Sequence, residues 1–402
     1  MTKLIHLAGG PVSRSVATAL LFGTIAAAQQ AVPMMVAVEP IEPPVTPLAS
    51  ESASAGVTRF SFIAYGDTRS GSEPDVPGDG EVLQSQHAAL VETMIGKIRS
   101  LASTPYPVRF VVQSGDAVLR GQNGTMWNVS FSPIIEKLTR GANVPYFFAV
   151  GNHDVTTMPA GDPGRALGLH NTLTAMSRLI PPEGSPRRLA GYPAYAFGFG
   201  NLFAFTFDSD IPSDRIQLAW VTDQLERLDR ARFTHVIAFF HHPPFTSGQH
   251  GGPILESQSA EIRDSYLPLF RKHHVRMTIA GHDHLLDHWV ERYVENGVSY
   301  RRDDVVTGGG GAPIYLYTGE PDLSEYLDAG AAENVRVEHL VKPGGTRDQN
   351  PHHFIVVRVD GDRLSLEAVA TGGAPYMPYG QPRIDLTDPR EATDRSQPAV
   401  RH

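Results

Sequence analysis

The sequence predicts an α/β protein in which helices cover a β-sheet. Short runs rich in β-branched and aromatic residues alternate with segments that place apolar residues at three- and four-residue spacing. This alternation is typical of strands that are connected by helices. The chain has 402 residues, of which 41% are hydrophobic, so it can bury a sizeable core and is not a wholly disordered chain.

Five of the short runs end in a polar loop, and we expect each of them to be a strand. They cover residues 60–65, 108–113, 146–150, 235–240 and 275–280. Apolar periodicity predicts helices over residues 83–101 and 216–228. Two β-hairpins are expected, one over residues 195–208 with its turn at Gly200-Asn201 and one over residues 354–370 with its turn at 360–362. Residues 301–341 show no clear pattern apart from a loop at the glycine run 308–311.

The first 28 residues differ in composition from the rest of the chain. Lys3 and Arg14 precede an uncharged apolar run, residues 16–28, that ends in three alanines, which is typical of a secretory signal. We therefore expect a signal peptide over residues 1–28 and a Pro/Ser/Ala-rich linker over residues 29–57. The main domain is predicted over residues 58–375 and a polar C-terminal tail over residues 376–402. Such a protein is exported, either to the periplasm or out of the cell, without stable insertion in a membrane.

Composition excludes several classes of function. The formal net charge is −9 and no long basic run occurs, so binding to nucleic acid is not expected. The chain has no cysteine, which excludes disulfides, thiolate metal sites and a cysteine nucleophile. Any metal ion must therefore be held by Asp, Glu, Asn or His, and the chain has 17 His.

Side chains that can bind metals follow the predicted strands. In open α/β sheets, ligands bind at the edge formed by the carboxyl ends of the strands, so loops far apart in the chain are expected to meet there. The side chains in question are Asp67, Asp116, Asn152, His153, His241, His242, His282 and His284. Oxygen and imidazole ligands without sulfur suit Zn²⁺, Mn²⁺ or Fe, and a carboxylate can bridge two such ions.

The order of these motifs resembles that of the calcineurin-like metallophosphoesterase superfamily. The motifs are Gly66-Asp67, Gly115-Asp116, Gly151-Asn152-His153-Asp154, His241-His242-Pro243 and Gly281-His282-Asp283-His284. Five motifs in order, each after a predicted strand, are far more specific than any one of them. The resemblance covers residues 58–375, and it implies a central β-sandwich of mixed sheets flanked by helices in four layers.

The resemblance also implies a site for two metal ions and assigns the ligands. Asp116 would bridge both ions, with Asp67 and His284 on one ion and Asn152, His241 and His282 on the other. His153 would lie near the substrate as a general acid or as a stabiliser of developing charge. His241 is preferred as the ligand because the family's His-x-Pro spacing is met by His241 and Pro243, and His242 remains the alternative.

One position departs from the family pattern. The first motif of the family usually reads Asp-x-His, whereas this chain has Asp67-Thr68-Arg69. An arginine has no lone pair for a metal ion, so the affinity of that site should fall. Arg69 is expected instead to pair with a substrate phosphate or with a ligand carboxylate, and it joins His153 as a catalytic candidate.

The activity that the resemblance implies is hydrolysis of phosphomonoesters or small phosphodiesters. The cofactors would be two divalent or di/trivalent ions (Mn, Zn or Fe), and the nucleophile would be a metal-bound hydroxide. The main alternative is a phosphate-ligand-binding or scaffolding protein whose catalysis is weakened by the loss of the first-motif histidine. A nuclease that acts on extracellular nucleic acid is a third alternative, but the chain lacks a basic stripe interleaved with aromatic residues.

Overall fold

The computed structural model describes residues 36–69, 84–155, 163–251, 255–373 and 376–386. The predicted signal peptide, residues 1–28, lies outside the described residues, as do residues 29–35 of the predicted linker and residues 387–402 of the predicted tail.

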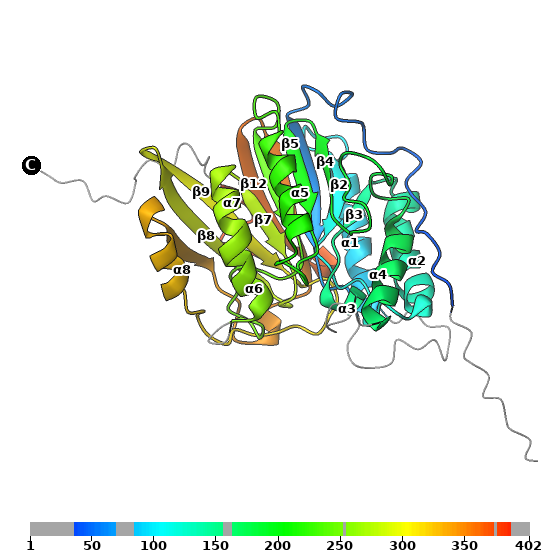
Figure 1. The fold of residues 1–402 in the computed structure, drawn as a ribbon. Coiled ribbons are helices and arrows are strands. Elements are labelled where there is room, and N and C mark those ends of the chain that lie inside the picture. Colours follow the sequence, from blue (N-terminus) through cyan, green and yellow to red (C-terminus); the bar gives the residue numbers. More distant parts are fainter. Residues whose placement is uncertain (1–35, 70–83, 156–162, 252–254, 374–375, 387–402) are drawn as a thin grey trace, which may run out of the picture. The chain divides into compact units, whose positions relative to one another are not determined.

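Two mixed β-sheets form the centre of the described part (Figure 1). The first has the order β13-β12-β11-β1-β2-β3 and the second has the order β10-β8-β9-β7-β6-β5-β4. The six strands of the first sheet are β1 (Arg59–Tyr65), β2 (Val108–Gln113), β3 (Tyr146–Phe148), β11 (His353–Asp360), β12 (Arg363–Ala370) and β13 (Ile384–Leu386). The seven strands of the second are β4 (Tyr195–Phe199), β5 (Leu202–Thr206), β6 (His235–Phe239), β7 (Met277–Ala280), β8 (Leu286–Glu295), β9 (Val298–Thr307) and β10 (Arg336–Val341). The parallel pairs are β1 with β2 and β2 with β3 in the first sheet, and β5–β6, β6–β7 and β7–β9 in the second.

Helices cover the outer faces of both sheets, which gives the expected four layers. The α-helices are α1 (Ser85–Leu101), α2 (Ser132–Glu136), α3 (Asn152–Val155), α4 (Pro163–Met176), α5 (Arg215–Glu226), α6 (Ser257–Glu261), α7 (Leu267–Lys272) and α8 (Ser324–Ala329). Helix α1 buries Leu90 and Met94 in one core with β1 and β11, whereas α5 and α7 bury Val221 and Phe270 in a second core with β5 and β6. Figure 1 shows α5 and α7 lying across the second sheet. Among the described helices, none combines the length and the apolar character that crossing a membrane requires.

Aromatic side chains fill the space between the two sheets. Phe110 and Phe147 belong to the first sheet and Phe197 to the second, and the ring centroid of Phe197 lies 5.2 Å from that of Phe110 and 4.0 Å from that of Phe147. Rings at these distances combine a large buried apolar area with favourable ring contacts. The two sheets are therefore held together by a continuous apolar core.

The predicted domain boundaries fall inside the packed structure. Residues 36–50 contain neither helix nor strand, and residues 51–56 form turns. The segment lies against the domain instead of forming a free linker: Ile41 is fully buried, and its N–H donates to the carbonyl of Ala175 at 2.9 Å. At the other end, β13 pairs with β12 and buries Leu386, so residues 384–386 are a strand and not a frayed tail. Composition predicts an extended backbone in both segments, but it does not reveal that single apolar residues such as Ile41 and Leu386 anchor them.

The predicted strands and hairpins are found close to their expected positions. Strand β3 ends two residues earlier than expected and β7 begins two residues later, while helix α1 is described from Ser85. Both hairpins are antiparallel pairs, β4 with β5 and β11 with β12, and Gly200 at the first turn has φ +58°. Residues 301–341, which have no clear sequence pattern, contribute the end of β9, helix α8 and strand β10.

Candidate metal centre

The loops after β1, β2, β3, β6 and β7 meet at one edge of the two sheets. Three of their residues have left-handed backbone conformations that are uncommon outside glycine: Asp67 (φ 60°), Asp116 (φ 56°) and His282 (φ 71°). Such conformations cost about 1–3 kcal/mol each and persist where the surrounding structure imposes them. Their occurrence in three loops at the same edge indicates a site that is built at the expense of local stability.

The glycines of the motifs allow these loops to approach one another closely. Gly115 has φ +105°, and a Cβ there would lie 2.6 Å from Nδ1 of His241. A Cβ at Gly151 would lie 2.4 Å from the backbone nitrogen of Asp116. Any side chain at either position would therefore push the loops apart.

The glycine run after β9 closes this edge of the second sheet. The N–H of Gly310 donates to the carbonyl of Gly66 at 2.8 Å, and the N–H of Ala312 donates to that of Asp67 at 2.9 Å. The run therefore lies at the site, and it helps to hold Asp67 in its strained conformation.

One set of side chains, the first donor group, consists of Asp67, Asp116 and His284. The candidate ligand atoms of these three buried residues lie within 4.8 Å of one another, and Nε2 of His284 is 3.6 Å from Oδ1 of Asp67. Nδ1–H of His284 donates to the carbonyl of Pro313 at 2.7 Å, which leaves the lone pair of Nε2 facing the carboxylates. Tyr315 stacks on the same imidazole with ring centroids 4.0 Å apart.

A neighbouring set, the second donor group, consists of Asp116, Asn152, His241 and His282. Nε2 of His241 lies 2.9 Å from Oδ1 of Asn152, 3.4 Å from Oδ1 of Asp116 and 3.2 Å from Nδ1 of His282. Asp116 therefore belongs to both groups.

Hydrogen bonds outside the second donor group set the tautomers of its two histidines. Nδ1–H of His241 donates to the carbonyl of Ser114 at 3.0 Å, and Nε2–H of His282 donates to Oε2 of Glu256 at 2.8 Å. Burial lowers the pKa of His241 to about 3, so its imidazole is neutral. Nε2 of His241 then directs its lone pair at the oxygens of Asn152 and Asp116, and Nδ1 of His282 directs its lone pair at Nε2 of His241. Lone pairs that face one another repel, and a cation bound between them would relieve this repulsion. Each ring also donates its other N–H to an outer acceptor, as metal-ligating histidines do.

The carboxylates of the first donor group have strongly perturbed ionisation. Burial raises the pKa of Asp67, and the negative charge of Asp116 raises it further. Burial also acts to raise the pKa of Asp116, but His241, His153 and Arg69 outweigh it and hold that pKa below its usual value. Two buried carboxylates this close need positive charge to remain ionised together.

Both catalytic candidates contact Asp116. Nε of Arg69 donates to Oδ2 of Asp116 at 3.2 Å, and its Nη2 lies 3.5 Å from Nε2 of His284. The backbone N–H of His153 donates to Oδ1 of Asp116 at 3.0 Å. The side chain of His153 is 30% exposed, with Nε2 3.9 Å from Oδ2 of Asp116.

Comparison with known proteins decides the family. The model of the calcineurin-like phosphoesterase family matches residues 63–286, which is more than half of the chain. The chain belongs to this family. The family is one of metal-dependent phosphoesterases, and it implies that the chain binds divalent ions.

The chain is similar to several solved structures, and a phosphatase with a TM-score above 0.5 shares its fold. A purple acid phosphatase from yellow lupin is 15% identical, with a TM-score of 0.56 over 85% of this chain and 55% of that protein. The chain thus spans about half the length of the lupin enzyme. A dimetal phosphatase from Danio rerio is 16% identical, with a TM-score of 0.46 over 82% of this chain and 99% of that protein. GAP50, the anchor in the inner membrane complex of Plasmodium, is 13% identical, with a TM-score of 0.48 over 83% of this chain and 90% of that protein.

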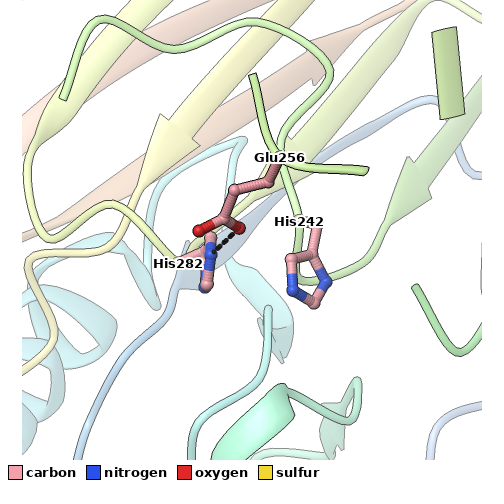
Figure 2. A group of neighbouring side chains, drawn as sticks. All are labelled: His242, Glu256 and His282. Atoms are coloured by element: carbon pink, nitrogen blue, oxygen red, sulfur yellow. Dashed lines mark hydrogen bonds and ion pairs between the residues drawn. The ribbon is translucent and has the colours of Figure 1, made fainter. Parts of the chain in front are cut away.

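In this phosphoesterase, all six predicted ligands lie in the two donor groups, and the two adjacent histidines are clearly distinguished. His241 lies in the second donor group, whereas Nδ1 of His242 is bonded to Oγ of Ser209 at 2.9 Å. His242 instead lies beside Glu256 and His282, in another group whose candidate ligand atoms are within 4.8 Å of one another (Figure 2). In Figure 2 the hydrogen bond joins His282 to Glu256, and His242 stands next to this pair.

Three residues of the site were missed by sequence reasoning. Glu256 orients His282, Tyr315 stacks on His284, and His250 lies with its ring centroid 4.0 Å from that of His282 and its Nδ1 2.8 Å from Oε1 of Glu256. Each lies several residues beyond the nearest motif or glycine run, so the motif spacing offers no signal for them.

Proposed function

We propose that this protein is a dinuclear-metal-dependent phosphoesterase that hydrolyses phosphomonoesters or small phosphodiesters. The single observation that carries the proposal is the position of Asp116. Its Oδ1 lies 3.4 Å from Nε2 of His241, and its carboxylate also belongs to the group formed with Asp67 and His284. One carboxylate that joins two donor groups is the arrangement needed to bridge two ions.

Each donor group would hold one ion. Asp67, Asp116 and His284 would bind the first ion, and Asp116, Asn152, His241 and His282 the second. When bound, the two ions supply a water of lowered pKa as nucleophile and neutralise charge on the phosphoryl oxygens. Mn²⁺, Zn²⁺ and Fe all suit these oxygen and nitrogen donors.

His153 is suited to assist the departure of the alcohol. Its Nδ1–H donates to the carbonyl of Leu119 at 2.9 Å, which fixes the ring and leaves Nε2 directed to the site. Because the side chain is partly exposed and close to Asp116, a substrate can reach it. From there, Nε2–H of the protonated imidazolium can donate a proton or a hydrogen bond to the leaving oxygen, while Nδ1–H stays on Leu119.

The proposal is tested by reconstitution and turnover. The purified chain is stripped of metal, reloaded with Mn²⁺, Zn²⁺ or Fe, and assayed with p-nitrophenyl phosphate and with its bis-ester. We expect turnover of one or both esters that depends on the added metal. Elemental analysis of the protein as purified then identifies the native ions.

The alternative is a protein that binds a phosphate ligand without hydrolysing it. The observation in its favour is Arg69, which stands where the family usually has a metal-binding histidine. Binding of phosphate without turnover under every metal would support this alternative. A nuclease would instead show a strong, salt-dependent affinity for DNA.

We also propose that the protein is exported, on the basis of the basic and apolar character of residues 1–28. Sequencing of the mature N-terminus and fractionation of the producing cells test this proposal. A protein that keeps residues 1–28 and stays in the cytoplasm would contradict it.

A further inference from the structure

Arg69 lies against the donor atoms of the first donor group. Its Nε donates to Oδ2 of Asp116 at 3.2 Å, and its Nη2 is 3.5 Å from Nε2 of His284. The Arg69 side chain is only 11% exposed. Two of the three residues that would hold the first ion are thus already in contact with a guanidinium group.

The donor atoms themselves are held in place by other contacts. Both carboxylate oxygens of Asp67 accept the backbone N–H of His282 at 3.0 Å, and His284 is fixed by Pro313 and Tyr315. The guanidinium also makes a side-chain hydrogen bond with Tyr315, but it has no lone pair for a metal ion and stands at the end of a side chain with several rotatable bonds. When an ion enters the first donor group, Arg69 is therefore the part that has to move.

The second donor group has a different environment. In the described part of the chain, the side-chain hydrogen bonds and ion pairs of Asn152, His241 and His282 join them to one another and to Asp116, Ser114 and Glu256. None of these contacts involves an arginine or a lysine. The shared residue Asp116 does contact Arg69, but through Oδ2, whereas His241 lies against Oδ1. An ion can therefore use Oδ1 in the second donor group without displacing the guanidinium.

We propose that Arg69 is an internal cation that competes with the metal ion of the first donor group. This inference rests on the proposed function. The protein then binds one ion tightly in the second donor group, and a second ion enters the first donor group only when Arg69 leaves Asp116. A guanidinium has no lone pair to offer a metal, so it cannot join the coordination and opposes the ion by charge and by occupancy.

The experiment measures metal binding and not activity. Metal-free full-length protein is titrated with Mn²⁺ by calorimetry, and the number of ions retained after gel filtration is determined by elemental analysis. For the wild type we expect one tightly bound ion and a second bound at least about tenfold more weakly, the size of effect seen when a neighbour of a metal ligand is altered.

Two substitutions distinguish two causes of weak binding at the first donor group, namely the positive charge of Arg69 and the absence of the histidine ligand that the family usually has. Arg69→Met removes the cation without adding a ligand and should tighten the second ion. Arg69→His also adds the imidazole that the family usually has, so the second ion should bind about 10- to 100-fold more tightly than in the wild type. Arg99→His is the matched control because Arg99 is an exposed residue near the end of α1, and it should leave both ions unchanged.

Two results would overturn the inference. One is a wild-type protein that binds two ions with equal affinity. The other is an Arg69→Met variant that binds the second ion no better than the wild type, since the missing ligand alone would then explain the weak site. Failure of the proposed function looks different: either no variant binds any ion, or ions bind and no phosphate ester is hydrolysed.

Discussion

Glu256 is the residue whose replacement tests the construction of the metal centre most directly. Its Oε2 accepts Nε2–H of His282 at 2.8 Å, and its Oε1 accepts Nδ1–H of His250 at 2.8 Å. Burial acts to raise the pKa of Glu256, but the hydrogen bonds from these two histidines outweigh it and lower the pKa. The ionised carboxylate thus keeps the proton of His282 on Nε2 and leaves the lone pair of Nδ1 toward His241 in the second donor group.

Glu256→Gln removes this charge while keeping the shape of the side chain. An amide cannot accept from both histidines with equal strength, so one charge-assisted hydrogen bond, worth about 1.5–3 kcal/mol, is lost. Because the Glu256 side chain is 34% exposed, solvent screening places the loss at about 1.5 kcal/mol. That energy corresponds to a dissociation constant for the ion of the second donor group that is about tenfold higher.

The assay is calorimetric titration of the metal-free protein with Mn²⁺, followed by turnover at saturating Mn²⁺. Turnover should recover when metal is in excess, since all the ligands remain in place. Glu325→Gln, at an exposed position of α8, is the control and should change neither quantity. An unchanged dissociation constant, or turnover that stays lost at saturating metal, would show that Glu256 does not act through His282.

Three further predictions concern catalysis and stability. Asp116→Asn should abolish turnover and leave the thermal unfolding transition nearly unchanged; more than a tenth of wild-type activity at saturating metal would refute the bridging role. His153→Ala should lower turnover more than bound metal, and a parallel loss of metal would make His153 a ligand. Burial lowers the pKa of His87 from 6.5 to about 3, so between these values only the unfolded state takes up the proton and stability falls as the pH is lowered. Between pH 7 and pH 5, the wild type should lose about 2 kcal/mol of unfolding free energy through His87. Denaturant unfolding at the two pH values should show a loss that is smaller by this amount in His87→Gln. Equal losses in both proteins would contradict this assignment.

The strands that carry the site could be predicted from the sequence because an apolar run and the turn residues that follow it indicate the same strand and loop. Residues 108–113 are all apolar except Arg109 and Gln113, and the glycine and aspartate that follow mark a turn, so strand and loop are both evident. Parallel strands bring such loops to one edge, which is why the predicted ligands meet in the structure.

The hairpin of β8 and β9 was not predicted, although its turn carries a signal. Asn296 and Gly297 both have positive φ, 51° and 79°, as a tight hairpin turn requires, and Asn-Gly is the usual sequence for it. The flanking pattern is hidden by buried charges, since Arg302 is fully buried and pairs with Glu291 at 3.0 Å and with Asp304 at 2.9 Å. These charged residues are buried because they find ion-pair partners on the same and the neighbouring strand, and the local sequence does not reveal this pairing.

The sequence alone therefore determined the family motifs, the oxygen and nitrogen character of the ligands and the sheet edge where they lie. Tertiary structure decided that His241 and not His242 faces Asp116, that Glu256 orients His282 and that Arg69 lies on the carboxylate of Asp116. The reason is physical: a motif specifies residue types and local backbone, whereas the direction of a lone pair depends on hydrogen-bond partners that lie tens to hundreds of residues away in the chain.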